Sequence, residues 1–399
     1  MGTHPASVGK AILALYAMNF LNSMGFGAFG VIVPLYMRDT GVSFVGLGLA
    51  FGVFGVVMGI AGMFFGAHSD VVGRKPYLVL SLALRVFTNL FYINAQSLID
   101  FVILQALSGV SASLSGAIVP ALMTDLTMDV ERGRKFGRMG GYGWLGTGSG
   151  YFLGGVLSQI FGYNASFIFL SVLTAISCVL ILGFVPSYRL STGERFHIGL
   201  VKGFSPNFKI WLLVAFATAL VIGPVEAMVI PTYAVFPGPL GIDKILFGSF
   251  MSAGYILTSS TQFIGGSLAD KYNRRKLASL FYLLSAPFIL VQPFYLSFVY
   301  FALMYVLEGF GEGLFQPCAN AMRASSVRTE HRGFDFSILN LLGNVGGTIG
   351  FIGMGYILDT LGFVYPFVMR AIVYFLIVAL IYVGIRDSDA PKRDFRYIR

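Results

Sequence analysis

Long apolar runs occupy most of this chain. Twelve of them approach the length that an α-helix needs to cross a membrane, which is about 20 residues for a hydrocarbon core of about 30 Å. Hydrophobic residues make up 56% of the 399 positions and charged residues only 11%, which is not the composition of a soluble globular domain. The runs lie approximately at 11–35, 45–65, 77–94, 99–123, 136–160, 165–186, 210–235, 246–265, 277–295, 298–321, 336–358 and 363–385. The sequence therefore predicts an all-α membrane protein with twelve transmembrane helices.

The basic residues gather in alternate connecting segments. If both termini are cytoplasmic, 23 of the 27 lysines and arginines lie on the cytoplasmic side, where such residues stay during insertion. Only Arg38 and Lys244 then fall in outer loops. This pattern predicts a multi-pass protein of the cell (plasma or inner) membrane with both termini cytoplasmic. The net charge of +9 is then explained by this topology and by contact with the lipid bilayer, and it does not indicate nucleic-acid binding.

A charged motif occurs twice, 200 residues apart. The stretch GAHSDVVGRKP at 66–76 shares its skeleton with GSLADKYNRRK at 266–276, and an Arg-Gly pair recurs at 132–133 and 332–333. Since each half contains an even number of runs, both halves have the same orientation and form parallel repeats.

These repeats predict a division of the chain into two halves. We expect an N-terminal six-helix half at 1–186 and a C-terminal six-helix half with a short cytoplasmic tail at 210–399. The segment 187–209, rich in serine, glycine and charge, is expected to be a cytoplasmic linker.

The pattern Gly-x-x-x-Asp-x-x-Gly-Arg-Lys-Pro at 66–76 resembles the signature loop of the major facilitator superfamily. With the partial copy at 266–276, the twelve runs and the linker, the resemblance covers essentially the whole chain. It implies the major facilitator fold, in which two pseudo-symmetric six-helix halves rock around a site near the middle of the membrane.

In that family the motif acts as a cytoplasmic latch that holds the halves together when the transporter faces outward. The glycines would allow close helix approach, and the aspartates would favour the positive end of a neighbouring helix. The alternative is that the basic residues only follow the orientation rule, which accounts for Lys75 better than for the repeated glycine and aspartate. The latch residues implied here are Gly66, Asp70, Gly73, Arg74, Lys75, Asp125, Arg132, Gly266, Asp270, Arg274, Arg275 and Arg332.

The fifth run carries small residues at helical spacing. Gly146, Gly150, Gly154 and Gly155 would make a flat face for close packing. The stretch is similar to the fifth-helix motif of drug and proton antiporters of the superfamily, although Tyr151 stands where a proline is usual. The alternative is a packing face with no meaning for antiport.

Few ionisable residues fall inside the runs, and a charge at mid-bilayer costs at least ~2.5 kcal/mol on insertion scales. Glu308 and Glu312 are four residues apart on one face of the tenth run, and Glu226 lies in the seventh. In the family these helices line the central cavity, together with the first and fourth. A carboxyl group in such a low-dielectric site favours its protonated form, so these acids are candidate proton carriers, with Glu308 first among them.

Two further ionisable residues have structural interpretations. Arg370, in the twelfth run, could pair with one glutamate and fix its charge. Arg85 lies on a helix that is peripheral in the family, so we expect it to reach toward the membrane surface or to pair locally.

Several polar side chains are also candidates for the cavity wall, although interior Asn and Gln often only bond neighbouring helices. Gln105 stands where related exporters commonly have an arginine, so the role of that arginine is not carried over. With 39 Phe and 20 Tyr in the chain, we expect an aromatic wall as well. The candidate polar residues are Asn22, Gln105, Gln316, Asn340 and Asn344.

Together these features predict a secondary active transporter, with proton-coupled export of small lipophilic or cationic compounds as its function. The alternative is a proton symporter or uniporter for a sugar or other polar metabolite. The sequence has no phosphate-binding loop, no metalloprotease or serine-hydrolase motif, and its two cysteines are not at metal-ligand spacing. We therefore expect no enzyme activity, no metal and no cofactor, and a monomer whose partners are its small-molecule substrate, protons and lipid.

Overall fold

The computed structural model describes residues 5–127, 129–186, 203–328 and 332–386. Its first half contains α1 (Pro5–Asp39), α2 (Phe44–Val72), α3 (Arg74–Phe91), the short turn η1 (Tyr92–Asn94), α4 (Leu98–Asp125), α5 (Asp129–Ile160) and α6 (Gly162–Phe184). Its second half contains α7 (Pro206–Ala217), η3 (Thr218–Ile222), η4 (Val225–Val229), α8 (Ile230–Ala234), α9 (Lys244–Lys271), α10 (Arg274–Val291), η5 (Gln292–Phe294), α11 (Phe298–Ser326), α12 (Arg332–Thr360), α13 (Val364–Ala379) and η6 (Leu380–Gly384). The fold is all-α, as the sequence predicts. Most of the expected linker, 187–202, lies outside the described residues.

Ten helical segments among the described residues are long and apolar enough to cross a membrane. The two other long helices, α5 and α9, have 32 and 28 residues but a lower mean hydropathy. In α5 the reason is its many glycines, which shorten the distance to neighbouring helices but add little apolar character.

The segment predicted as the seventh helix is not a uniform α-helix. Two wider π-helical turns, η3 and η4, interrupt it between α7 and α8. Pro224 stands between these turns and has no backbone N–H to donate, so the regular hydrogen-bond ladder cannot continue through it. Such π-helical turns occur frequently at functional sites.

The glycines of α5 contact α1 within the first half. A Cβ at Gly146 or Gly150 would collide with a backbone carbonyl of α1, and one at Gly154 would lie 2.7 Å from the Cα of Ala28. Gly155 lies on another face of α5, where a Cβ would meet the carbonyl of Lys244 at the start of α9. The four glycines thus serve both the packing of the first half and its contact with the second.

Helices α2 and α12 run along each other between the halves, as do α5 and α9. Polar contacts join the halves at the end of the bundle away from the described chain ends. Asp359 of α12 accepts a hydrogen bond from the backbone N–H of Val45 at 2.9 Å. Lys244 of α9 lies 3.7 Å from the Asp39 carboxylate of α1 and donates to the Tyr163 hydroxyl at 2.6 Å.

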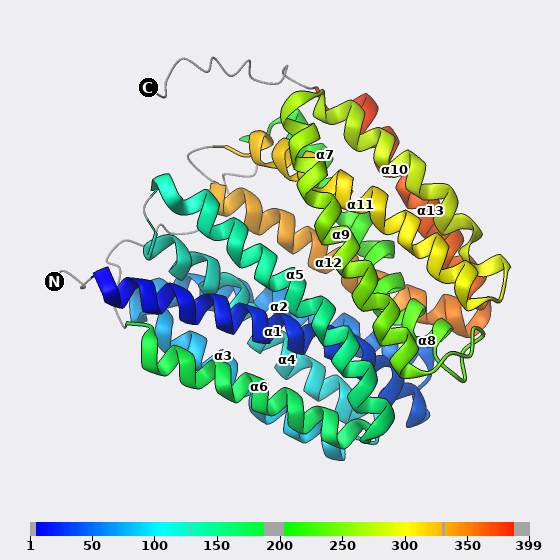
Figure 1. The fold of residues 1–399 in the computed structure, drawn as a ribbon, viewed down its shortest axis with the longest axis horizontal. Coiled ribbons are helices and arrows are strands. Elements are labelled where there is room, and N and C mark those ends of the chain that lie inside the picture. The colour runs from blue at the N-terminus through cyan, green and yellow to red at the C-terminus, as the bar shows by residue number, and fades with distance from the viewer. Residues whose placement is uncertain (1–4, 128, 187–202, 329–331, 387–399) are drawn as a thin grey trace.

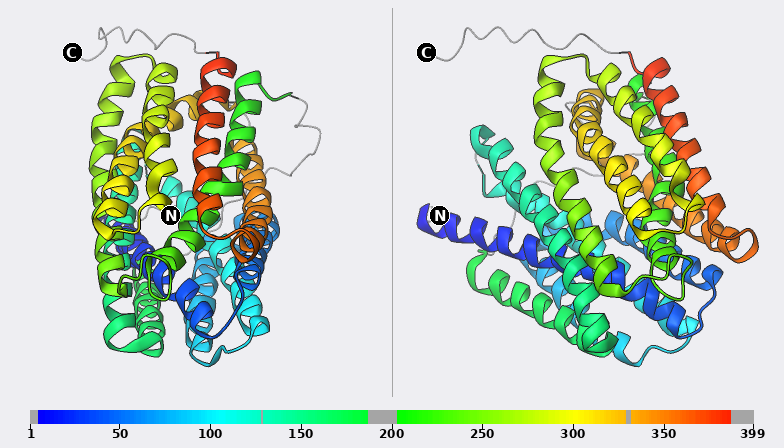
Figure 2. Two further views of the ribbon diagram at one scale, coloured as in Figure 1. Left: turned by 90° about the vertical axis from the view of Figure 1, so that its right-hand side faces the viewer. Right: turned by 45° about the vertical axis from the view of Figure 1, so that its right-hand side comes forward.

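The two groups of helices diverge toward the opposite end, where the described chain begins and ends (Figures 1 and 2). We call the end with the Asp359 and Lys244 contacts the closed end, and the other the open end.

Candidate functional site

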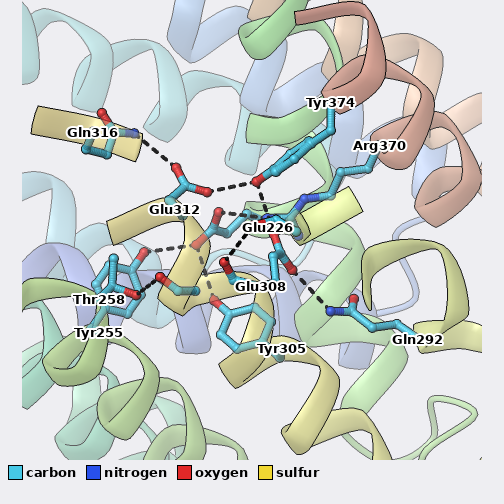
Figure 3. A network of polar contacts seen from close by, with 12 residues as sticks. Glu226, Tyr255, Thr258, Gln292, Tyr305, Glu308, Glu312, Gln316, Arg370 and Tyr374 are labelled. Atoms are coloured by element: carbon cyan, nitrogen blue, oxygen red, sulfur yellow. Dashed lines mark hydrogen bonds and ion pairs between the residues drawn. The ribbon is translucent and has the colours of Figure 1, made fainter. Parts of the chain in front are cut away.

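One buried acid, two partly buried acids and one arginine meet in the second half (Figure 3). Glu226 comes from η4, Glu308 and Glu312 from adjacent turns of α11, and Arg370 from α13. The Nη2 atom of Arg370 lies 2.5 Å from Oε1 of Glu308 and 3.6 Å from Oε2 of Glu226. The side chains of Arg370 and Glu308 are only 2% and 3% exposed, whereas that of Glu226 is 31% exposed. We call these four residues the acid cluster.

Neutral side chains supply hydrogen bonds to the acid cluster (Figure 3). The Tyr374 hydroxyl lies 2.8 Å from Oε2 of Glu312 and 3.2 Å from Oε1 of Glu308. Gln292 donates to Glu308 at 3.1 Å, and Gln316 donates to Glu312 at 3.0 Å.

Two more tyrosines contact the third acid. The hydroxyls of Tyr255 and Tyr305 donate to Oε1 of Glu226 at 3.3 and 3.4 Å. Arg370 thus pairs with two of the predicted acids instead of one, and Glu312 has no ion pair among the described residues.

Beside the acid cluster lies a cavity of about 170 Å³, which we call the acid cavity. Glu226, Glu308, Glu312, Gln316 and Arg370 line it, so four of the predicted site residues share one space. No group of three potential metal ligands suited to hold an ion occurs among the described residues. The carboxyl and amide groups that line the acid cavity can form hydrogen bonds, and the carboxyl groups can also exchange protons.

A second cavity, of about 200 Å³, lies mostly within the first half and holds Arg85. We call it the arginine cavity. Asn22 and Gln105 also line it, as predicted for the cavity wall, together with aromatic rings from α1, α2, α5 and α12. Arg85 was expected to reach the membrane surface or to pair locally. It instead lines this interior space, and no described residue forms a hydrogen bond or an ion pair with it.

The two cavities are neighbours. Tyr151, which lines the arginine cavity, stacks on Tyr255 of the acid cavity with ring centroids 5.0 Å apart. On η4, Glu226 lines the acid cavity and the next residue, Ala227, lines the arginine cavity. A single π-helical turn therefore touches both spaces.

The two predicted cavity residues of α12 are placed elsewhere. Asn340 is exposed, and Asn344 lies against α2, where its Nδ2 would be 3.4 Å from a Cβ at Gly59. Neither residue lines the acid cavity or the arginine cavity, so a role for them in a cavity wall stays a prediction.

Three of the latch residues make contacts within their own halves. Lys75 donates to the carbonyl of Leu182 at 2.8 Å, Arg274 lies 3.8 Å from Asp270, and Arg275 donates to the carbonyl of Ile385 at 3.1 Å.

The latch glycines have different roles in this conformation. Gly73 separates α2 from α3 with a φ of 114°, a left-handed conformation that favours glycine. A side chain at Gly266 would meet open space, so no neighbouring helix packs on it here. The surroundings of Gly66 and the side chains of Asp70, Asp125, Arg132 and Arg332 lie outside the part of the chain that the structure describes.

Sequence reasoning missed the tyrosines and Gln292. Tyr305 precedes Glu308 by three residues on one helix, and this spacing could have identified it. Tyr255, Tyr374 and Gln292 come from other helices, and no local pattern marks them.

The fold and the buried polar site are those of a helical membrane transporter, and the comparisons with known proteins agree. The sequence profile of the Major Facilitator Superfamily matches residues 15–236 and again 215–396, and the chain belongs to this family. An uncharacterized MFS-type transporter of Methanocaldococcus jannaschii is 20% identical over 365 residues, covering 88% of this chain and 92% of that protein.

Two further similarities concern proteins with named roles. The multidrug resistance protein MdtG of Citrobacter koseri is 24% identical over 348 residues, covering 83% of this chain and 84% of that protein. The crystal structure of a mutant of the nucleoside transporter NupG superposes with a TM-score of 0.76 at 12% identity, covering 94% of this chain and 100% of that one.

Proposed function

We propose that this transporter exports small lipophilic compounds in exchange for protons, by alternating access across the cell membrane. The observation that supports the coupling is the acid cluster. If all three carboxyl groups were ionised, three negative charges would face one positive charge in a partly buried site, and uncompensated buried charge is costly. A proton bound to one of the acids reduces this cost.

The hydrogen bonds of Tyr374 favour Glu312 as the proton carrier. A tyrosine hydroxyl has one hydrogen and cannot donate to Glu308 and Glu312 at the same time. A protonated Glu312 would donate to the Tyr374 oxygen and leave that hydroxyl free to donate to Glu308. Glu308, whose carboxylate lies 2.5 Å from Arg370, is the acid that stays ionised.

The π-helical turn η4 supports coupling between proton and substrate. Glu226 contacts Arg370 and two tyrosines on one side of the turn, and Ala227 lines the arginine cavity on the other. A change in the charge of the acid cluster alters the Glu226–Arg370 attraction, and η4 can transmit this change to the neighbouring cavity.

The distribution of basic residues assigns the termini to the cytoplasm, so the open end would face the cytoplasm. In this conformation the latch would be released, and it would close when the transporter opens outward. We propose the same two halves, 1–186 and 210–399, as the moving bodies.

The apolar character of the arginine cavity supports a lipophilic substrate. A cationic substrate has less support, because Arg370 already pairs with Glu226 and Glu308. The similarity to the multidrug resistance protein MdtG agrees with export.

The test is proton flux in proteoliposomes that contain a pH-sensitive dye and carry an imposed pH gradient. Addition of a transported lipophilic compound should cause protons to cross the membrane of proteoliposomes that contain the wild type. Glu312→Gln should abolish this proton flux. Glu194→Gln, the same substitution in the expected linker, is the control and should behave as wild type. Compound movement that is independent of the gradient and unchanged in Glu312→Gln would contradict the proposal and favour a uniporter.

A further inference from the structure

The arginine cavity contains a cation without an anion. Arg85 comes from α3 and lines the cavity, and no described residue provides it with a carboxylate or a hydrogen-bond acceptor. A charged group inside the membrane is costly, and such groups are usually paired or functional. None of the described residues compensates the positive charge of Arg85.

Polar atoms around Arg85 are also unsatisfied. Gln105 is 0% exposed, and neither its Nε2 nor its Oε1 has a hydrogen-bond partner among the described residues. The Oδ1 atom of Asn22 is likewise buried without a partner. Since burying a polar group without a hydrogen-bond partner is costly, three such atoms beside one cavity indicate a ligand that bonds to them.

The rest of the wall is apolar and aromatic. Phe26, Phe29, Phe51, Phe54 and Phe351 line the cavity, and the rings of Phe51 and Phe351 stack across the two halves with centroids 5.2 Å apart. Such a wall favours contact with a flat apolar body. It also strengthens the attraction of Arg85 for a negative charge.

We propose that the arginine cavity is the substrate site and that the substrate is an apolar, aromatic molecule carrying one anionic group, which Arg85 binds with help from Gln105. This inference rests on the proposed function and specifies its substrate class. Phe351 and Ala227 belong to the second half, so a bound substrate contacts both halves. Through Ala227 its binding can alter the position of η4.

The test uses three probes with the same apolar body. They are 1-naphthalenesulfonate (anionic), 1-naphthalenesulfonamide (neutral) and (1-naphthylmethyl)trimethylammonium (cationic), titrated calorimetrically into the full-length protein in detergent. The wild type should bind the anion at least about tenfold more tightly than the other two, the usual gain from a hydrogen bond to a charged group.

Variants of Arg85 separate its charge from its packing. Arg85→Gln should weaken anion binding by about tenfold or more and leave binding of the sulfonamide within about twofold, whereas Arg85→Lys should retain part of the preference. Arg138→Gln, the same substitution at an exposed site on α5, is the control. Equal binding of the three probes, binding of the cation only, binding of none, or anion affinity unchanged in Arg85→Gln would overturn the proposal.

A second measurement does not depend on the probes. Without ligand, Arg85→Gln should unfold at a higher temperature than the wild type, because it removes an unpaired charge from the interior. A loss of thermal stability would indicate that Arg85 has a structural partner and would contradict the proposal.

The two proposals can fail separately. If the proton mechanism is wrong, Glu312→Gln will still exchange protons while the anion binds normally. If the substrate class is wrong, Arg85→Gln will leave anion binding unchanged while Glu312→Gln still loses proton release.

Discussion

Glu308 and Glu312 are one helical turn apart but have different surroundings. Glu308 is 3% exposed and touches Arg370 at 2.5 Å, whereas Glu312 receives hydrogen bonds from Tyr374 and Gln316 and forms no ion pair among the described residues. We therefore propose that the same residue type has a structural role at one position and exchanges a proton at the next turn. The sequence hypothesis ranked Glu308 first as proton carrier, and the geometry transfers that proposed role to Glu312.

This difference predicts that two matched substitutions lower the free energy of unfolding by unequal amounts. Glu308→Gln should lower the free energy of unfolding by about 3 kcal/mol, because it leaves the Arg370 charge buried without its nearest partner. Glu312→Gln should cost less than about 1 kcal/mol, since an amide oxygen can still accept from Tyr374. Denaturant unfolding in detergent measures both. Equal losses would show that Arg370 does not depend on Glu308.

Among the helices, α5 relies on glycine for its approach to α1. A Cβ at Gly150 would collide with the carbonyl of Met24, whereas one at Gly140 on the same helix would meet nothing within 4 Å. Gly150→Ala should therefore lower stability by about 1–3 kcal/mol through overpacking, and Gly140→Ala should not destabilise. Melting temperatures of the two variants decide this. If both lost stability equally, helix packing would not be the cause.

The start of α2 is held by a carboxylate from the other half. Asp359 accepts from the backbone N–H groups of Phe44 and Val45, which favours the positive end of the helix. Asp359→Asn should weaken the contact between the halves at the closed end by about 1 kcal/mol. The population should then shift about fivefold toward a state in which this end is open.

Spin labels at Arg138 and Lys276, both exposed near the open end, measure this shift by electron resonance distances in a variant whose native cysteines are replaced. Asp100→Asn is the control, because Asp100 accepts hydrogen bonds only from Gln96 and Ser97, at the start of its own helix α4. A distance distribution that Asp359→Asn leaves unchanged would argue against a role for this contact in alternation.

For the whole molecule, the latch is expected to act on the exchange between states and not on the substrate site. Lys75, Arg274 and Arg275 contact their own halves in the conformation seen here. Arg74→Ala or Asp70→Asn should therefore lower transport by about fivefold or more, while equilibrium binding changes by less than about twofold. Parallel flux and calorimetric measurements separate the two effects. Equal loss of binding and transport would argue against a latch.

The sequence by itself determined the class of the protein. Hydropathy, the position of basic residues and the 200-residue repeat are local properties or simple spacings, and they predicted an all-α membrane fold of this family. The same reasoning found the three acids and the glycine face of α5, because charge inside an apolar run and small residues four apart are visible in one segment.

Only the tertiary structure decided which of these residues work together. The pairing of Arg370 with two acids, the shared hydroxyl of Tyr374 and the unpartnered Arg85 depend on which faces of separate helices meet. Asn344 shows the same limit, since its position against Gly59 of α2 could not be read from its own segment. Residues far apart in the chain meet through packing, and packing depends on the shapes of all the helices at once.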